Sequence, residues 1–265
     1  MKKLLTTVVM GATFLLASCG TKTTNVTSTT QENSVKQVQL TDGSETVEVK
    51  TNPKKIVTFD LGSADTLRAI GQGETIVGMP TKPLPTYIKD LGEKVQNVGS
   101  MKEPDIEAIA AMQPDLIIAS ARTKDFIPQL KEIAPTVIFS VDSKDYWGSV
   151  QKNVKNLASL FNEEAQQKAS AQVKELQTVI DTIAAQNEKH SEKSLAIMLN
   201  EGKMSAFGAQ SRFGFLYQDL KFRPTDAKIE ESRHGQEISF EGVSELNPDV
   251  LFVLNRTLAI GGDNS

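Results

Sequence analysis

The sequence is poor in the residues that form covalent cross-links and metal sites. Its 265 residues include one cysteine and two histidines. A single thiol excludes a disulfide within a monomer. The sequence also lacks the HExxH, CxxC and HxH spacings with which protein side chains complete a metal site. We therefore expect no intrinsic metal cofactor, and a bound metal would have to bring most of its own ligands.

Motifs of catalysis and nucleotide binding are missing as well. There is no GxSxG, no Walker A loop, and no GxGxxG after the first expected strand. The formal net charge of −4 does not favour nucleic acid as a partner. Beyond the N-terminal segment, no apolar run approaches the ~20 residues needed to cross a bilayer. These absences favour a binding protein over an enzyme.

The N-terminal 19 residues form a signal peptide by their composition. Lys2 and Lys3 precede an apolar run, and the segment ends in Leu16-Ala17-Ser18-Cys19. This end resembles a lipoprotein signal-peptidase site, and the only cysteine of the chain lies at the cleavage point. We predict that Cys19 carries the lipid that anchors the mature protein on the outer face of the cell membrane.

The rest of the chain divides into four parts. Residues 20–52 predict a flexible tether and a leading hairpin. In residues 53–161 strands and helices alternate, which predicts a lobe with a parallel sheet. Residues 162–190 predict a long rigid linking helix, and residues 191–265 a second lobe. The predicted fold is therefore α/β, with two similar lobes, mostly parallel sheets and a ligand cleft between the lobes. By comparison with the first lobe, the C-terminal one looks truncated, unless the lobes are less alike.

One segment of the sequence appears twice, without a gap. Residues Glu107 to Arg122 read EAIAAMQPDLIIASAR, and residues Glu241 to Arg256 read EGVSELNPDVLFVLNR. Both copies predict a helix, a Pro-Asp pair, a buried strand and an arginine at its carboxyl end. Ligands of open α/β sheets bind at that end of the strands. If the lobes face each other, Arg122 and Arg256 point into the cleft, and two permanently charged groups there require an anionic ligand.

Further candidates for ligand contact lie outside the repeat. Arg212 follows an expected strand in the loop SAFGAQSRFG, although a solvated surface charge is the alternative. His234 lies in a segment without helical or strand periodicity, where an imidazole is either exposed or free to bind a metal. Tyr146 and Trp147 are interpreted as packing residues.

Glu107 and Glu241 each lie in the first turn of a predicted helix. A carboxylate there is electrostatically favourable. Its recurrence in both copies suggests a second use, as one acidic contact per lobe for a symmetric partner.

Together these segments resemble a known family, the lipid-anchored substrate-binding proteins of iron-siderophore ABC transporters, in the helical-backbone class III of periplasmic binding proteins. The resemblance extends from about Lys50 to the last residue. It is carried by KIVTFDLGSADTLRAIG, VGSMKEPDIEAIAAMQPDLIIASAR, KEIAPTV, SAFGAQSRFG, RHGQEISFEGVSELNPDVLFVLNR and the lipobox. The chain is most similar to the branch that takes ferric catecholates, including petrobactin-type siderophores. The resemblance implies capture of an Fe(III)-siderophore and its delivery to an ABC permease dimer by a monomeric protein.

The resemblance also assigns roles to residues. In that branch three arginines surround the catecholate oxygens, and Arg122, Arg212 and Arg256 match them. A histidine of that branch can complete iron coordination when the siderophore supplies only four donors, and His234 matches it. The branch pairs this histidine with a tyrosine nearer the C-terminus, and this sequence ends before the matching position. Two acidic residues of the family contact permease arginines, and they match the glutamates of the repeat.

Several alternatives remain open from the sequence. Haem, cobalamin or a hydroxamate siderophore could replace the catecholate within the same class. An extracellular metal-dependent or hydrolytic enzyme would need a nucleophile and a base near His234, where only Ser232 and the nearby acidic residues are available. A surface adhesion lipoprotein could use the acidic residues, but that function leaves the paired arginines unexplained.

Overall fold

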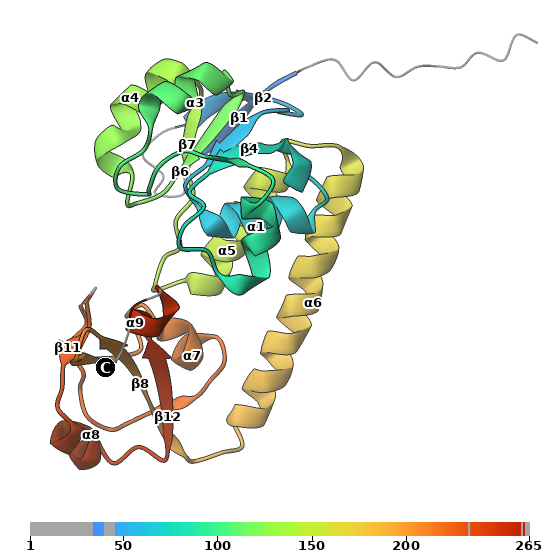
Figure 1. Cartoon of the computed structure of the whole chain (residues 1–265). Coiled ribbons are helices and arrows are strands. Elements are labelled where there is room, and N and C mark those ends of the chain that lie inside the picture. The colour runs from blue at the N-terminus through green and yellow to red at the C-terminus, as the bar shows by residue number, and fades with distance from the viewer. Residues whose placement is uncertain (1–33, 40–45, 233, 261, 263–265) are drawn as a thin grey trace, which may run out of the picture. The chain divides into compact units, whose positions relative to one another are not determined.

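The computed structural model describes residues 34–39, 46–232, 234–260 and 262. The predicted signal peptide and Cys19 lie outside these residues, as does most of the predicted tether. In the described part of the chain, none of the helices combines the length and apolar character needed to cross a membrane. Residues Asn33–Ser265 form one compact unit, which contains two main β-sheets (Figure 1).

A short hairpin precedes the first main sheet. Strands β1 (Val35–Gln39) and β2 (Thr46–Lys50) pair antiparallel, with Val38 opposite Val47. Val38 and Val49 are buried and join the hydrophobic core of the following sheet. Two paired strands thus lie where the sequence predicts a leading hairpin, whereas the segment between them lies outside the described residues.

The N-terminal sheet contains five strands in the order β5-β4-β3-β6-β7, and every neighbouring pair is parallel. Parallel pairing requires a crossover between consecutive strands, which the alternating helices supply. The predicted parallel sheet is therefore confirmed for this part of the chain. Its strands are β3 (Ile56–Thr58), β4 (Ile76–Met79), β5 (Gln96–Asn97), β6 (Leu116–Ala119) and β7 (Thr136–Ile138).

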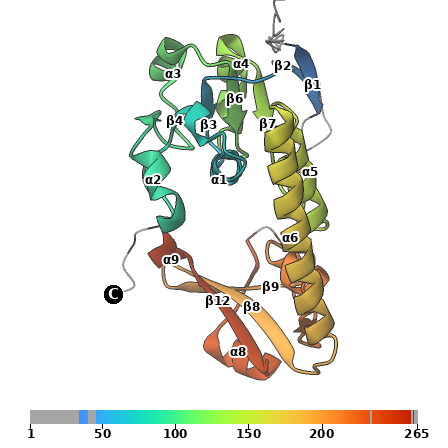
Figure 2. The ribbon, with the colours of Figure 1, turned by 90° about the vertical axis from the view of Figure 1, so that its right-hand side faces the viewer.

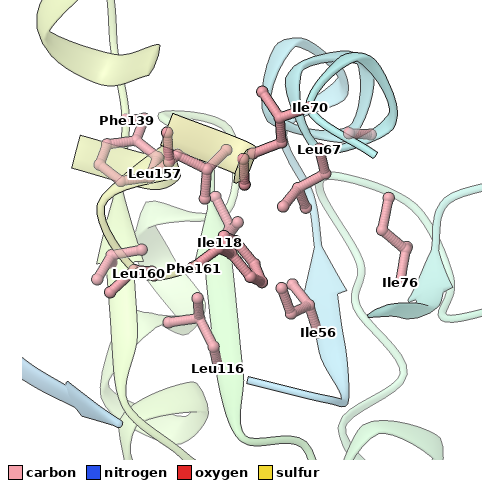
Figure 3. Close-up of a cluster of buried hydrophobic side chains, with 14 of the residues drawn as sticks. Ile56, Leu67, Ile70, Ile76, Leu116, Ile118, Phe139, Leu157, Leu160 and Phe161 are labelled. Atoms are coloured by element: carbon pink, nitrogen blue, oxygen red, sulfur yellow. The ribbon is translucent and has the colours of Figure 1, made fainter. Parts of the chain in front are cut away.

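Helices cover both faces of the N-terminal sheet. Leu116 and Ile118 of β6 belong to one buried cluster, together with Leu157 of the covering helices (Figure 3). Ile117, between them in the strand, belongs to a second buried cluster with Leu130. Because alternate residues of a strand point to opposite faces, both faces of this sheet are buried. The helices of this part are α1 (Leu61–Ala69), α2 (Lys89–Gly92), α3 (Ile106–Met112), α4 (Ile127–Ile133) and α5 (Tyr146–Ala158), with short 3-10 turns η1 (Gly73–Thr75), η2 (Thr86–Ile88) and η3 (Lys124–Phe126).

A single long helix, α6 (Glu163–Asn187), follows α5, so the prediction of a long helix in this part of the chain is confirmed (Figure 1). Asn162 caps its first turn, with Oδ1 accepting the backbone N–H of Ala165 at 3.0 Å. At 1.5 Å per residue its 25 residues extend about 37 Å. The indole N–H of Trp147 on α5 donates to Gln177 on α6 at 2.5 Å, so this tryptophan links the two helices.

The C-terminal sheet is mixed, which differs from the prediction of mostly parallel sheets in both lobes. Its central strand β8 pairs parallel with β10 and β12 and antiparallel with β9, and β9 pairs antiparallel with β11. Glu201 and Gly202 both have positive φ, of 51° and 76°. Such a pair forms the tight turn of a hairpin, so β9 folds back beside β8 (Figure 2).

The strands of this sheet are β8 (Lys193–Asn200), β9 (Lys203–Phe207), β10 (Arg223–Pro224), β11 (Gln236–Glu237) and β12 (Val250–Asn255). Its helices are α7 (Gly214–Gln218), α8 (Phe240–Leu246) and α9 (Arg256–Ala259).

The two copies of the repeat share their local structure. The helices α3 and α8 end in left-handed residues, Gln113 and Asn247, before the Pro-Asp pair. Asp115 Oδ2 then accepts the backbone N–H groups of Lys54 and Lys55, at 2.7 and 2.9 Å. Asp249 Oδ2 accepts the N–H of Lys193 at 2.7 Å. In both copies the aspartate therefore ties the helix-to-strand turn to the start of the neighbouring strand.

The strands of the two copies differ in burial. All of β6 is buried between β3 and β7. In β12, by contrast, Leu251, Val253 and Leu254 are exposed, because among the described strands β12 pairs only with β8. The expectation of a buried strand is therefore wrong for the second copy.

Replacing Asp115 with alanine should lower the free energy of unfolding by about 1–3 kcal/mol, because two backbone N–H groups lose their acceptor. Urea denaturation followed by circular dichroism measures this loss. Asp115→Asn keeps an acceptor oxygen and should recover part of it. Asp125→Ala, at an exposed position, is the control. Equal stability of Asp115→Ala and the control would contradict the tie between the turn and β3.

Candidate functional site

A cavity of about 680 Å³ lies at the carboxyl end of the N-terminal sheet. Its walls come from the segments that follow β3, β6 and β7 and from α5, and they include Asp60, Arg122, Val141, Tyr146 and Asn153. This is the edge at which open α/β sheets bind ligands. We call it the Arg122 cavity.

A compact turn positions Arg122 on the wall of this cavity. Thr123 is fully buried, and its hydroxyl group donates to the carbonyl of Ser120 and accepts the N–H of Ser120, both at 2.8 Å. The backbone N–H of Arg122 donates to Ser120 Oγ at 3.2 Å. Arg122 is an exposed residue, and its Nη1 lies 3.9 Å from Met101 Sδ. The turn therefore fixes the backbone and leaves the charged group accessible to a ligand.

Asp60 is a wall residue that sequence reasoning missed. It caps α1, and its Oδ2 accepts the backbone N–H of Ser63 at 2.9 Å and the hydroxyl of Ser63 at 2.6 Å. Burial raises the pKa of the Asp60 carboxyl, and hydrogen bonds from Ser63 and Gly62 partly oppose this effect. The position of Asp60 directly after a parallel strand is the signal that could have identified it.

The raised pKa of Asp60 predicts a pH dependence of stability. A carboxyl whose pKa is higher in the folded state binds its proton more tightly there, so stability falls as pH rises from its ordinary pKa of 3.8 through the folded value. Asp60→Asn cannot ionise and should therefore gain stability relative to the wild type as pH rises. Urea denaturation of both proteins at pH 4 and pH 7 tests this, and a relative gain that is absent at pH 7 would contradict it.

A second cavity, of about 700 Å³, is lined by residues from both parts of the chain that carry a main sheet. One wall is formed by residues 141–146, between β7 and α5, and the other by the loop after β9 and by Glu231 and Ser232. Arg212 lies on the second wall. We call this space the Arg212 cavity.

The loop that carries Arg212 is anchored at several points. Ser211 is buried and its hydroxyl donates to the carbonyl of Gly208 at 2.6 Å. The side-chain amide of Gln218 donates to the carbonyl of Ala209 and, at 3.2 Å, to the carbonyl of Ser143 on the opposite wall. Arg212 is exposed, with Nη1 3.7 Å from Met198 Sδ. As for Arg122, the backbone is fixed and the charged group borders a cavity.

Tyr146 is part of the walls of both cavities. Its ring centroid lies 5.1 Å from that of Phe215, and burial, with contributions from Asp219 and Tyr87, raises the pKa of its hydroxyl group. The interpretation of Tyr146 as a packing residue accounts for its contact with Phe215 and does not account for its place in the two cavity walls. Its place shortly after the carboxyl end of β7 could have indicated the second role.

The other two predicted ligand contacts lie elsewhere. Arg256 opens α9 and donates to Asn200 Oδ1, and His234 is exposed in a turn that a 2.9 Å hydrogen bond from Ser232 Oγ to the Gly235 carbonyl closes. Neither residue lines the Arg122 or the Arg212 cavity. Within the described ranges, no group of three or more His, Cys, Asp or Glu side chains is arranged to hold a metal ion.

Glu107 and Glu241 lie in the first turns of α3 and α8, as predicted, and both are exposed. The pKa of the Glu241 carboxyl is lowered by a hydrogen bond from the backbone N–H of Glu241 and by one from the Ser239 side chain. Both positions are therefore accessible to a partner.

Comparison with known proteins identifies the family. The periplasmic binding protein family matches residues 56–265. The petrobactin-binding protein YclQ of Bacillus subtilis is 36% identical over 253 residues, which cover 95% of this chain and 79% of that protein, and its crystal structure has a TM-score of 0.83. Other curated relatives from Bacillus subtilis are named as substrate-binding or siderophore-binding lipoproteins.

Two further crystal structures are similar. The iron uptake ABC transporter substrate-binding protein PiuA of Streptococcus pneumoniae has 60% identity and a TM-score of 0.83, with 86% of this chain and 80% of that chain covered. The catecholate-siderophore binding protein VctP of Vibrio cholerae has 28% identity and a TM-score of 0.80, covering 88% and 82%. These matches confirm the predicted binding protein rather than an enzyme. The chain belongs to the periplasmic binding protein family, among the substrate-binding proteins of iron-siderophore ABC transporters.

Proposed function

We propose that this protein captures a ferric catecholate-type siderophore outside the cytoplasm and delivers it to an ABC permease. The observation that carries the proposal is the placement of Arg122 and Arg212 on the walls of two cavities that share Val141 and Tyr146. Ferric catecholates are anionic, and guanidinium groups donate strong charge-assisted hydrogen bonds to such oxygens. The petrobactin and catecholate specificities named for YclQ and VctP support the same ligand class.

The aromatic side chains of the Arg212 cavity fit the rest of such a ligand. Tyr146, Phe213 and Phe215 line this cavity, and aromatic rings stack favourably with one another in offset or edge-to-face arrangements. Catechol rings can therefore contact the aromatic walls while their oxygens accept hydrogen bonds from the arginines.

The proposal includes further roles that follow from the family resemblance. Arg256 is the third arginine, and His234 is an iron ligand for siderophores that supply only four donors; both act on parts of the ligand outside the two cavities. Iron enters only as Fe(III) carried by the siderophore. Glu107 and Glu241 contact the permease, and a lipid on Cys19 anchors the protein to the membrane. The division into a tether, two lobes and a linking helix belongs to the same proposal.

Isothermal titration calorimetry of the full chain in detergent tests the ligand class. The probes are a ferric bis-catecholate, a ferric tris-catecholate, a ferric hydroxamate and haem, and circular dichroism confirms that the chain is folded. We expect tight binding of catecholates and weak binding of the other two. Tight binding of haem or of the hydroxamate alone would replace this proposal with one of those ligands.

A further inference from the structure

The Arg212 cavity has a carboxylate in its wall, that of Glu231. Its Oε1 accepts the backbone N–H of Gln210 at 3.3 Å. The carboxylate also lies against Gly208: a Cβ atom added to this glycine would come within 2.5 Å of Oε1 and 3.4 Å of Oε2. Gly208 therefore leaves the space that the carboxylate occupies, and the Arg212 loop fixes the negative charge in the cavity wall.

A fixed negative charge is unfavourable for a ligand that is anionic throughout. Lys144 and Arg212 in the same cavity attract an anionic chelate, whereas Glu231 repels it. A carboxylate can accept about four hydrogen bonds, and the bond from Gln210 uses one. The carboxylate is exposed, so it remains accessible to a donor on the ligand.

The aromatic walls of this cavity favour the same kind of donor. The rings of Tyr146, Phe213 and Phe215 line the space together with Glu231. The face of an aromatic ring attracts a cation within about 6 Å. A positively charged nitrogen in this cavity would therefore gain from both the carboxylate and the rings.

We infer that Glu231 recognises a protonated amine of the ligand, so that the siderophore is a ferric catecholate whose linker carries a positive charge. The inference rests on the proposed function and narrows its ligand class. Arg122 and Arg212 contact the anionic chelate, and Glu231 contacts the cationic linker. Glu231 is thereby a specificity-determining residue.

Two synthetic ferric bis-catecholates of equal linker length test the inference. One linker contains a central secondary amine, which is protonated at pH 7, and the other has a methylene group in its place. Calorimetry of the full wild-type chain in detergent should show about tenfold tighter binding of the amine compound, as expected for one charge-assisted contact. Glu231→Gln keeps an acceptor oxygen for the Gln210 N–H, and should lose most of this preference while binding the methylene compound at least as tightly as the wild type.

Two more variants separate the charge from its position. Glu230→Gln makes the same change in net charge at an exposed neighbouring residue and should retain the preference. Gly208→Ala keeps the charge but displaces the carboxylate, and should reduce the preference.

The outcomes distinguish this inference from the function on which it rests. Equal binding of both compounds by the wild type would overturn the inference and leave catecholate capture in place. Equal weakening of both compounds in Glu231→Gln would overturn it too, since Glu231 would then only hold the loop. If the folded wild type bound neither compound, the proposed function would fall, and the inference with it.

Discussion

Replacing Arg122 and Arg212 together with alanine is expected to weaken binding of a ferric bis-catecholate by about a hundredfold or more. A hydrogen bond to a charged group contributes about 1.5–3 kcal/mol, and two such losses correspond to a factor of about a hundred or greater. Both arginines are exposed residues that line cavity walls, so their replacement should leave the fold intact. Calorimetry measures the affinity, and circular dichroism checks the fold.

Arg223→Ala is the matched control for this experiment. Arg223 is exposed on β10, 3.7 Å from Asp226, and does not line either cavity. Its replacement should leave the affinity nearly unchanged, because Arg223 does not line the Arg122 or the Arg212 cavity. If the double variant behaved like this control, neither cavity would be the siderophore site.

Replacing Phe207 with alanine is expected to lower the free energy of unfolding by about 3–5 kcal/mol. Phe207 is fully buried, and its ring meets Phe213 edge-on at 4.8 Å between centroids. Because Gly208 follows it and begins the loop of Arg212, the variant should also bind the siderophore more weakly. Urea denaturation measures the first effect and calorimetry the second.

Phe240→Ala provides the comparison, since it makes the same chemical change at a side chain that is 81% exposed. It should alter stability by no more than about 0.5 kcal/mol. A loss below about 1 kcal/mol in Phe207→Ala would contradict the expectation, because the C-terminal sheet would then fill the space left by the ring.

Local sequence signals predicted much of the fold. The repeat predicted the positions of α3, β6, α8 and β12. In each copy the Pro-Asp pair marks the boundary between the helix and the strand, and the apolar run that follows is typical of a strand. The long helix α6 was equally evident from its length and its cap at Asn162. These features depend on neighbours in the sequence, and the sequence displays them directly.

The pairing of the second sheet could not be predicted in this way. β8 and β9 are joined by Glu201-Gly202, which carries little turn signal beyond its glycine, and the two-residue strands β10 and β11 arise only from their contacts with β8 and β9. The repeat also suggested equal sites for Arg122 and Arg256. Arg122 lies in a turn, but Arg256 begins a helix, and this difference follows from the residues after each arginine.

Local patterns also indicated two of the residues that line the cavities, whose binding role stays a prediction. The carboxyl-end rule located Arg122, and the loop between a strand and a helix located Arg212. Glu231 joins the wall of the Arg212 cavity through contacts between segments distant in sequence, which no local pattern reveals.

The shared position of Tyr146 has a consequence for how ligand preference can change over evolution. Since one ring belongs to the walls of both cavities, a substitution at this residue alters the two spaces at once. If the proposed function holds, a descendant of this protein could therefore accept a siderophore of different size through a single mutation, while Arg122 and Arg212 stay unchanged.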